Sequence, residues 1–206
     1  MSFLRLSARL LAPATALALV APAALAQPAD PLRQVEQSLG ATQSMSARFT
    51  QTDGRGRSQS GTLSLKRPGK IRFEYGAGAN ILLVGDGKNL TFLDYEVGQK
   101  SAWPIAKSPL SVLLSPQPNL SRIARIEKQA NPNIVIVRAR DARRPEFGTL
   151  LLAFSRQAGA PGGLMLEGWT AIDAQNKKTT VKLDGQRYNV ALPDSAFTYA
   201  EPRKRR

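Results

Sequence analysis

The chain has 206 residues with 29 Lys or Arg, 15 Asp or Glu, no Cys and no His, and its formal net charge is +14 at pH 7. Without Cys there can be no disulfide, thiolate nucleophile or thiolate zinc site, and without His the commonest general base is missing. Ser-His-Asp and Cys-His enzymes are therefore excluded. Hydrophobic residues form 42% of the chain, which is enough for one domain of ordinary size.

The first 26 residues have the features of a Sec-type signal peptide. Basic residues without acids come first, an apolar stretch follows over residues 10–25, and a small-x-small cleavage site ends at Ala26. A membrane anchor is the alternative, but two prolines interrupt a stretch that is already short for a span. We therefore expect the chain to be exported to the periplasm, cleaved after Ala26, and folded as a single domain over residues 27–206.

The large positive charge raises the question of an anionic partner. Nucleic acid is disfavoured because an exported protein rarely meets it as a specific target, which leaves phospholipid headgroups, lipopolysaccharide or an acidic protein surface. The alternative is that scattered Lys and Arg residues solvate the outer face of a sheet, since most of them alternate with apolar residues. The one basic run is the C-terminal tail, residues 203–206.

A short helix is the first element predicted after the signal peptide. Asp30 is a suitable N-cap, Pro31 suits the first helical position, and a partly amphipathic pattern continues to Leu39. We expect Gly40 to end this helix, because glycine is common just beyond the last helical residue.

Alternation with a period of two begins at Met45 and predicts β-strands. Turn residues at 53–56 separate the first strand from a second at residues 61–67. Because successive side chains of a strand point to opposite faces, Arg67 falls on the same face as the leucines of its strand. A third strand over residues 71–75 again places its apolar side chains on one face. Together they predict an aliphatic and aromatic wall with a guanidinium near its rim.

The remaining strands are short and separated by glycine-bearing turns. They are predicted at residues 81–84, 90–95, 134–140, 149–154, 164–172 and 179–183. This recurrence favours one antiparallel meander over alternating strand and helix units. One later helix is predicted, with Ser108 as N-cap, Pro109 in the first turn and Pro116 after its end. Its apolar residues predict burial on more than one side.

The fold class that we expect is mainly β with short α-helices, an α+β protein. A strongly curved antiparallel sheet would have its concave face covered by the helices. A closed barrel filled by side chains is a competing arrangement. An outer-membrane barrel is a third, disfavoured by the short strands and the internal helix.

Several segments resemble the LolA family, the periplasmic carriers of outer-membrane lipoproteins. The similar segments are residues 45–51, 61–75, 86–90 and 92–95, with 108–114 where the family has a lid helix. The resemblance implies an unclosed β-barrel of antiparallel strands with an α-helical lid over an apolar cavity. It also implies that acylated lipoproteins are taken from an inner-membrane ABC transporter and passed to an outer-membrane receptor.

Arg67 is the first residue to which the resemblance assigns a role. In the family this arginine is implied to bond the backbone of the lid helix and to hold the empty carrier closed. A desolvated guanidinium needs acceptors, and the carbonyls at a helix C-terminus are suitable ones. The alternative is that the end of the strand twists and Arg67 reaches solvent.

Acyl-chain binding is expected of the apolar residues on the predicted wall and lid. These are Phe49, Leu63, Leu65, Ile71, Phe73, Leu90, Phe92, Leu110, Leu113 and Leu114. Cavity lining and ordinary core produce the same pattern, and we favour lining for Leu63, Leu65, Ile71, Phe73 and Leu113. Trp103 and Trp169 fit either interior or rim positions.

Two functions fit these expectations. One is a lipoprotein chaperone, and the other is a periplasmic lipid-binding or signal-sensing module on the same half-barrel, without delivery. Neither needs a catalytic residue, a metal or a cofactor, and Asp94 and Glu96, which share a strand face, lack the surroundings of a sugar cleft. The family often has Trp where this chain has Phe73, and a basic tail replaces a terminal loop and strand of some members. The outer-membrane partner is therefore left open between a receptor and an anionic lipid surface.

Overall fold

The computed structural model describes residues 30–76 and 79–203. The predicted signal peptide, its cleavage after Ala26 and the tail residues 204–206 lie outside the described residues. Within the described ranges, no helix has the length and apolar character needed to cross a membrane.

A single antiparallel sheet of 11 strands contains all the strands of the described ranges. Its order is β6-β5-β4-β3-β2-β1-β11-β10-β9-β8-β7, so β1 and β11 meet in the centre while β6 and β7 are the edges. The strands are β1 Ser44–Thr52, β2 Ser58–Lys66, β3 Lys70–Tyr75, β4 Ile81–Asp86, β5 Asn89–Asp94, β6 Gln99–Pro104, β7 Ala124–Glu127, β8 Ile134–Ala139, β9 Thr149–Arg156, β10 Leu164–Ile172 and β11 Lys178–Tyr188.

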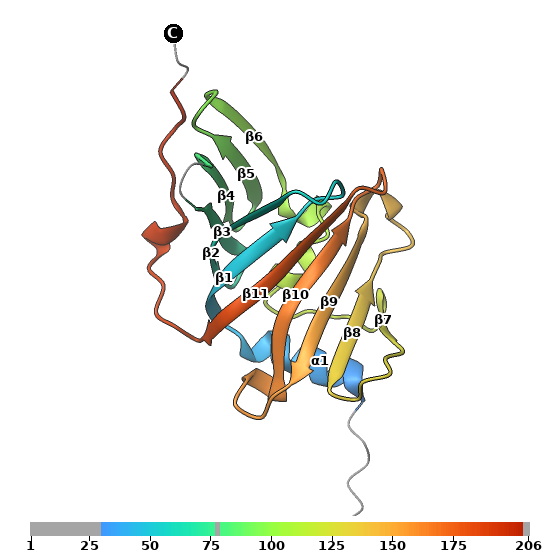
Figure 1. Cartoon of the computed structure of the whole chain (residues 1–206). Helices are drawn as coiled ribbons and strands as arrows, with labels where there is room; N and C mark the ends of the chain where they lie inside the picture. The colour runs from blue at the N-terminus through green and yellow to red at the C-terminus, as the bar shows by residue number, and fades with distance from the viewer. Residues whose placement is uncertain (1–29, 77–78, 204–206) are drawn as a thin grey trace, which may run out of the picture.

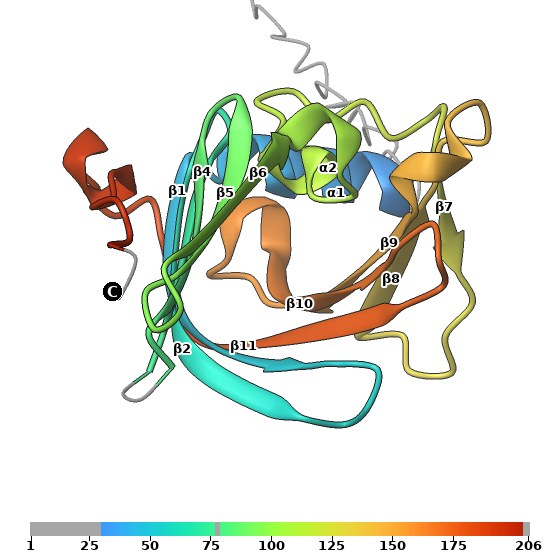
Figure 2. The same cartoon turned by 90° about the horizontal axis from the view of Figure 1, so that it is seen from above.

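The sheet curves strongly, and helices cover its open side. Figure 2 shows α1 and α2 lying across the gap between the two edge strands, above the concave face. Helix α1 spans Pro31–Ala41, and α2 is a single turn over Ser111–Leu114. Short 3-10 helices occur at η1 Ile105–Lys107, η2 Pro145–Phe147, η3 Pro161–Gly163 and η4 Asp194–Phe197. The expected α+β fold, an unclosed antiparallel barrel with a helical lid, is confirmed.

The first helix begins as predicted but ends later. The Asp30 side chain accepts a hydrogen bond from the backbone N–H of Leu32 at 3.0 Å. The expectation that Gly40 ends the helix is wrong, because the helix continues to Ala41. Thr42 ends it with an extended backbone, and its hydroxyl donates to the carbonyl of Ser38 at 2.9 Å.

The prediction for the second helix is wrong at its start. Ser108 is not its N-cap but follows η1, and the Ser108 hydroxyl donates to the carbonyl of Ile105 at 2.9 Å. Helix α2 starts later, at Ser111, with Leu110 preceding it and no side-chain cap. The reason is that η1 uses the residues before Ser108, so a second turn of helix starts only after Pro109.

Both edge strands, β6 and β7, were absent from the sequence prediction. An edge strand pairs on one side only, and these two carry mainly half-buried or exposed residues instead of a clean apolar alternation. The two tryptophans lie in different environments. Trp169 in β10 is 4% exposed and belongs to the core, whereas Trp103 in β6 is 39% exposed.

The chain after β11 crosses to the outer, convex face of the sheet, as Figures 1 and 2 show. We call residues 189–203 the C-terminal strap. Its Phe197 is buried against Leu82, Val84 and Leu93, which point outward from β4 and β5. The outer face of this half of the sheet therefore has a small apolar core of its own, separate from the one under the lid.

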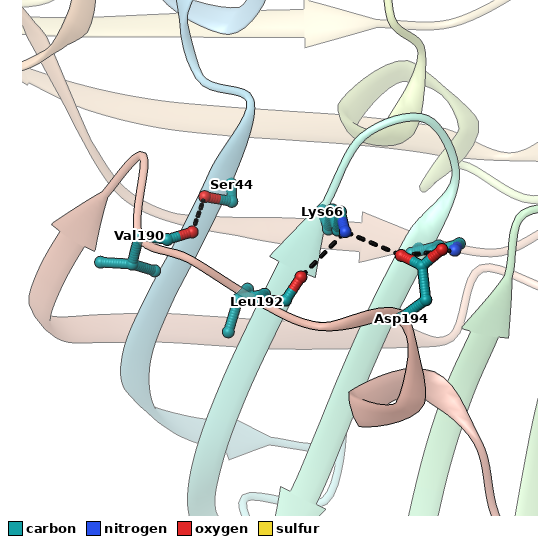
Figure 3. Close-up of polar contacts among 6 residues, drawn as sticks. Ser44, Lys66, Val190, Leu192 and Asp194 are labelled. Carbon is teal, nitrogen blue, oxygen red and sulfur yellow. Dashed lines mark hydrogen bonds and ion pairs between the residues drawn. The ribbon is translucent and has the colours of Figure 1, made fainter.

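Lysines attach the strap to the sheet (Figure 3). The Lys66 ammonium donates to the carbonyl of Leu192 at 2.8 Å and to the Asp194 carboxylate at 2.7 Å, and the Lys70 ammonium lies 3.0 Å from the same carboxylate. The Ser44 hydroxyl donates to the carbonyl of Val190. The hydrogen bonds from Lys66 and Lys70 lower the pKa of Asp194 to about 2.

Acid should loosen the strap. Because the pKa of Asp194 lies below its ordinary value of about 3.9, its pairing stabilises the attached strap above about pH 4 and is lost as pH falls through about 2. We expect the amide signal of Phe197 in NMR to shift over this range in the wild type. Asp194→Asn should remove that acid transition, and an unchanged transition in the variant would contradict the assignment.

A second prediction concerns Gly61, where β2 passes very close to β3. A Cβ atom at this position would lie 2.0 Å from the carbonyl oxygen of Glu74, and backbone would have to move. Gly61→Ala should lower the free energy of unfolding by about 1–3 kcal/mol, measured by urea denaturation. Gly159→Ala is the control, because its Cβ would meet nothing within 4 Å and should change stability by less than about 0.5 kcal/mol. Equal effects would show that the close approach is unimportant.

Candidate functional site

The concave face of the sheet and the undersides of the lid helices form one buried apolar cluster. Most of the residues expected to line the cavity lie in it, each at most 2% exposed: Phe49, Leu63, Leu65, Ile71, Phe73, Leu90, Leu113 and Leu114. Leu110 is half-buried and packs against the same cluster. The lid thus rests directly on these side chains, and the structure represents the closed arrangement.

Phe92 lies outside the apolar cluster that holds the other predicted lining residues. It lies two residues after Leu90 and so shares its face of β5, but it is half-buried and belongs to neither apolar cluster. Its partner across the strands is Ser101 of the edge strand β6. Phe92 therefore lies on the Leu90 face of β5, next to the edge strand β6.

Aromatic rings form the floor of the cluster. The Phe49 ring meets the rings of Phe73 and Tyr75 edge to face, each at a centroid distance of 5.1 Å. The Phe73 ring meets that of Trp169 at 6.0 Å, also edge to face. Edge-to-face pairs contribute beyond simple burial. These ring contacts link β1, β3 and β10 across the centre of the curved sheet. They also hold the aromatic side chains of the floor in one arrangement.

Arg67 joins the sheet to both lid helices. Its guanidinium donates through Nη1 to the carbonyl of Thr42 at 2.7 Å, and through Nε and Nη2 to the carbonyl of Leu113 at 3.2 and 2.8 Å. Thr42 caps the C-terminus of α1, and Leu113 lies in α2. The acceptors are thus helix carbonyls, of the type that the sequence reasoning named, and they belong to two helices rather than one.

The Arg67 guanidinium is buried, and this burial changes its pKa. The Arg67 residue is 7% exposed, and desolvation lowers the pKa of its guanidinium to about 10. It therefore remains charged at neutral pH. Burying a charge without hydrogen-bond acceptors is costly in free energy. The buried Arg67 charge is therefore stable only because its three hydrogen bonds offset the cost of desolvation.

The two lid helices are attached to the sheet unequally. Helix α1 makes several polar contacts that sequence reasoning missed, including the Ser38 hydroxyl to the carbonyl of Leu164 at 3.1 Å and the backbone N–H of Leu120 to the Glu36 carboxylate at 2.6 Å. Helix α2 is tied by Arg67 and by the backbone N–H of Gly69, which donates to the carbonyl of Leu114 at 3.1 Å. Helix α2 is consequently the part of the lid that Arg67 controls most directly.

The fold and this lid contact define a half-barrel protein with a helical lid over an apolar interior. Among the described residues, no three His, Cys, Asp or Glu side chains are grouped so that they could hold a metal ion. The buried apolar cluster offers burial of apolar groups, and the polar contacts beside it hold the lid in place.

Comparison with known proteins places the chain in a family. The model for "Outer membrane lipoprotein carrier protein LolA" matches residues 40–200. An outer-membrane lipoprotein carrier protein of Chromobacterium violaceum is 27% identical over 197 residues, 92% of each chain. One of Pseudomonas fluorescens is 28% identical over 197 residues, 91% of each chain. The crystal structure of a LolA superfamily protein from Nitrosomonas europaea matches with a TM-score of 0.46 at 11% identity, covering 82% of this chain and 97% of that one.

This chain belongs to the LolA family, which confirms the resemblance noted in its sequence. The matched residues include both the strands that form the floor of the cluster and the segment that carries α2.

Removing the guanidinium should loosen α2 selectively. Arg67→Leu leaves the carbonyls of Leu113 and Thr42 without their charged donor, and each such hydrogen bond is worth about 1.5–3 kcal/mol. We expect amide hydrogen exchange at Leu114 and Ser115 to accelerate at least about tenfold. The control is Arg48→Leu, which removes an exposed arginine from the outer face of β1. Equal protection of α2 in both variants would contradict a lid contact through Arg67.

Proposed function

We propose that this protein carries lipoproteins through the periplasm by covering their acyl chains with the concave face and the lid. Membership of the LolA family supports a lipoprotein carrier role. The observation that carries the proposal is the buried apolar cluster closed by a lid whose two helices are both bonded to one guanidinium, Arg67. No catalytic group, metal or cofactor is needed for this task.

Hydrophobic burial is large enough to drive loading. Each CH₂ group removed from water contributes about 0.8 kcal/mol, so partial coverage of an acyl chain is worth many kcal/mol. The cluster residues are almost fully buried in the closed arrangement, so chains reach them only when the lid moves. The cost of that movement includes the Arg67 hydrogen bonds, which re-form when the cargo leaves and thereby favour release.

The proposed route begins at the inner membrane. An ABC transporter that releases acylated lipoproteins supplies the cargo, and an outer-membrane receptor or an anionic lipid surface accepts it. The mature chain is proposed to start at Gln27 after export. A module that binds acyl chains without delivering them is the alternative, and it is one outcome of the experiment below.

The test is loading and onward transfer of a purified triacylated lipoprotein, scored separately. Phe73→Glu places an ionisable group, costly to desolvate, in the floor of the cluster and should reduce loading at least about tenfold. Leu110→Glu does the same at a half-buried lid position where folding is more easily preserved. Both variants are compared at a temperature where circular dichroism shows them folded.

The matched control is Thr50→Glu, which puts the same group on the exposed outer face of β1, opposite Lys182. It should load as the wild type does. Normal loading of both Phe73→Glu and Leu110→Glu would refute acyl binding under the lid. Wild-type loading without transfer to outer-membrane vesicles would favour the lipid-binding module over the carrier.

A further inference from the structure

Strand β7 lies on the side of the molecule away from the strap (Figure 2). Arginines gather at this edge of the sheet. Arg125 in β7 lies directly opposite Arg138 in β8. The backbone N–H of Arg140 donates to the carbonyl of Ile123 at 2.7 Å, which places Arg140 beside the turn that carries Arg122. These four arginines line a hollow of about 200 Å³ whose wall contains no acidic residue.

Little of this charge is neutralised within the protein. Arg138 pairs with the Glu127 carboxylate at 2.5 Å. Arg122, Arg125 and Arg140 are exposed, and within residues 30–76 and 79–203 their side chains make no salt bridge or hydrogen bond. Like charges directly opposite on paired strands are destabilising, and Glu127 pairs with Arg138 but not with Arg125, so an anion beside Arg125 would be stabilising.

A second hollow continues the basic surface. It measures about 630 Å³, shares Arg122 with the first, and adds Arg143 and Arg144 from the loop after β8. Its single acidic residue, Asp141, is already paired with Arg144 at 2.7 Å. We call the combined surface the arginine edge; it consists of Arg122, Arg125, Arg138, Arg140, Arg143 and Arg144.

We propose that the arginine edge docks this protein onto the phosphate headgroups of an anionic membrane. Guanidinium groups bind phosphate oxygens bidentately, and a hollow walled by four of them without an acid matches that chemistry. Exposed single contacts are weak and screened by salt. A lipid surface compensates because it offers many phosphates at once, and each Lys or Arg near it adds to binding. One free phosphate ion cannot span both hollows.

The arginine edge lies beside the lid, so docking there would bring the membrane close to the lid. Strand β7 is one of the two edges between which α1 and α2 cross the open side, so a membrane bound here lies beside the lid (Figure 2). This inference deepens the proposed function, because it names the surface through which the carrier meets a bilayer. Its test uses the empty protein, so it can succeed or fail independently of lipoprotein carriage.

The experiment is vesicle flotation with the full mature protein and no cargo. Vesicles of phosphatidylcholine alone are compared with vesicles of equal parts phosphatidylcholine and phosphatidylglycerol. We expect binding only to the second kind and its loss at about 1 M salt. Arg125→Gln combined with Arg140→Gln should weaken it on the order of tenfold or more.

The matched control is Lys182→Gln combined with Arg187→Gln, which removes the same net charge from exposed positions on β11. It should bind nearly as the wild type does. Equal losses in both double variants would overturn the proposal in favour of nonspecific positive charge, as would equal binding to the two kinds of vesicle. Full competition by inorganic phosphate at matched ionic strength would also overturn it and indicate a site for free phosphate. Capture of an acidic protein without vesicle binding would point to a protein partner instead.

Discussion

Arg67 places one guanidinium between the carbonyl ends of two helices and so bonds both of them at one point of the sheet. The sheet cannot close on itself, because β6 and β7 are separate edges, and its concave face is apolar. Something must cover that face, and helices with free carbonyl ends can do so only if a donor meets them. A single buried cation meets both at once. The lid, the closed interior and the possibility of opening all follow from this contact.

A lid held by polar bonds differs from one held by packing alone. Hydrophobic contact is nondirectional, so α2 could slide over the floor of leucines and aromatic rings at little cost. The hydrogen bonds to Leu113 and Thr42 impose a direction and a definite closed position. In the proposed function, acyl chains would compete with the lid for the same apolar surface, and their hydrocarbon would offer Arg67 no acceptors. Loading would then exchange hydrogen bonds for apolar burial, which would keep the balance reversible.

Some of the basic residues form ion pairs that stabilise the fold, and others are exposed on the β7 side. On the β2 to β6 side, Lys66 and Lys70 hold the strap, and Lys100 pairs with Glu201 at 2.6 Å. On the β7 side, the arginines outnumber their acidic neighbours. The interpretation that cations solvate the outer face does not describe these lysines, because they bind the C-terminal strap. One set closes the fold against its own C-terminal segment, and the other faces outward beside the lid.

The sequence by itself determined the strands whose side chains alternate, the apolar floor from Phe49 to Leu90, and the placement of Arg67 on the same face. These follow from the geometry of neighbouring residues, which the chain carries locally. Only the tertiary structure decided that Arg67 is buried and reaches carbonyls 25 and 46 residues away, that Phe92 stays outside the apolar cluster, and that the edge strands pair at all. Such contacts depend on where the curved sheet brings distant segments, and a local pattern holds no information about that path.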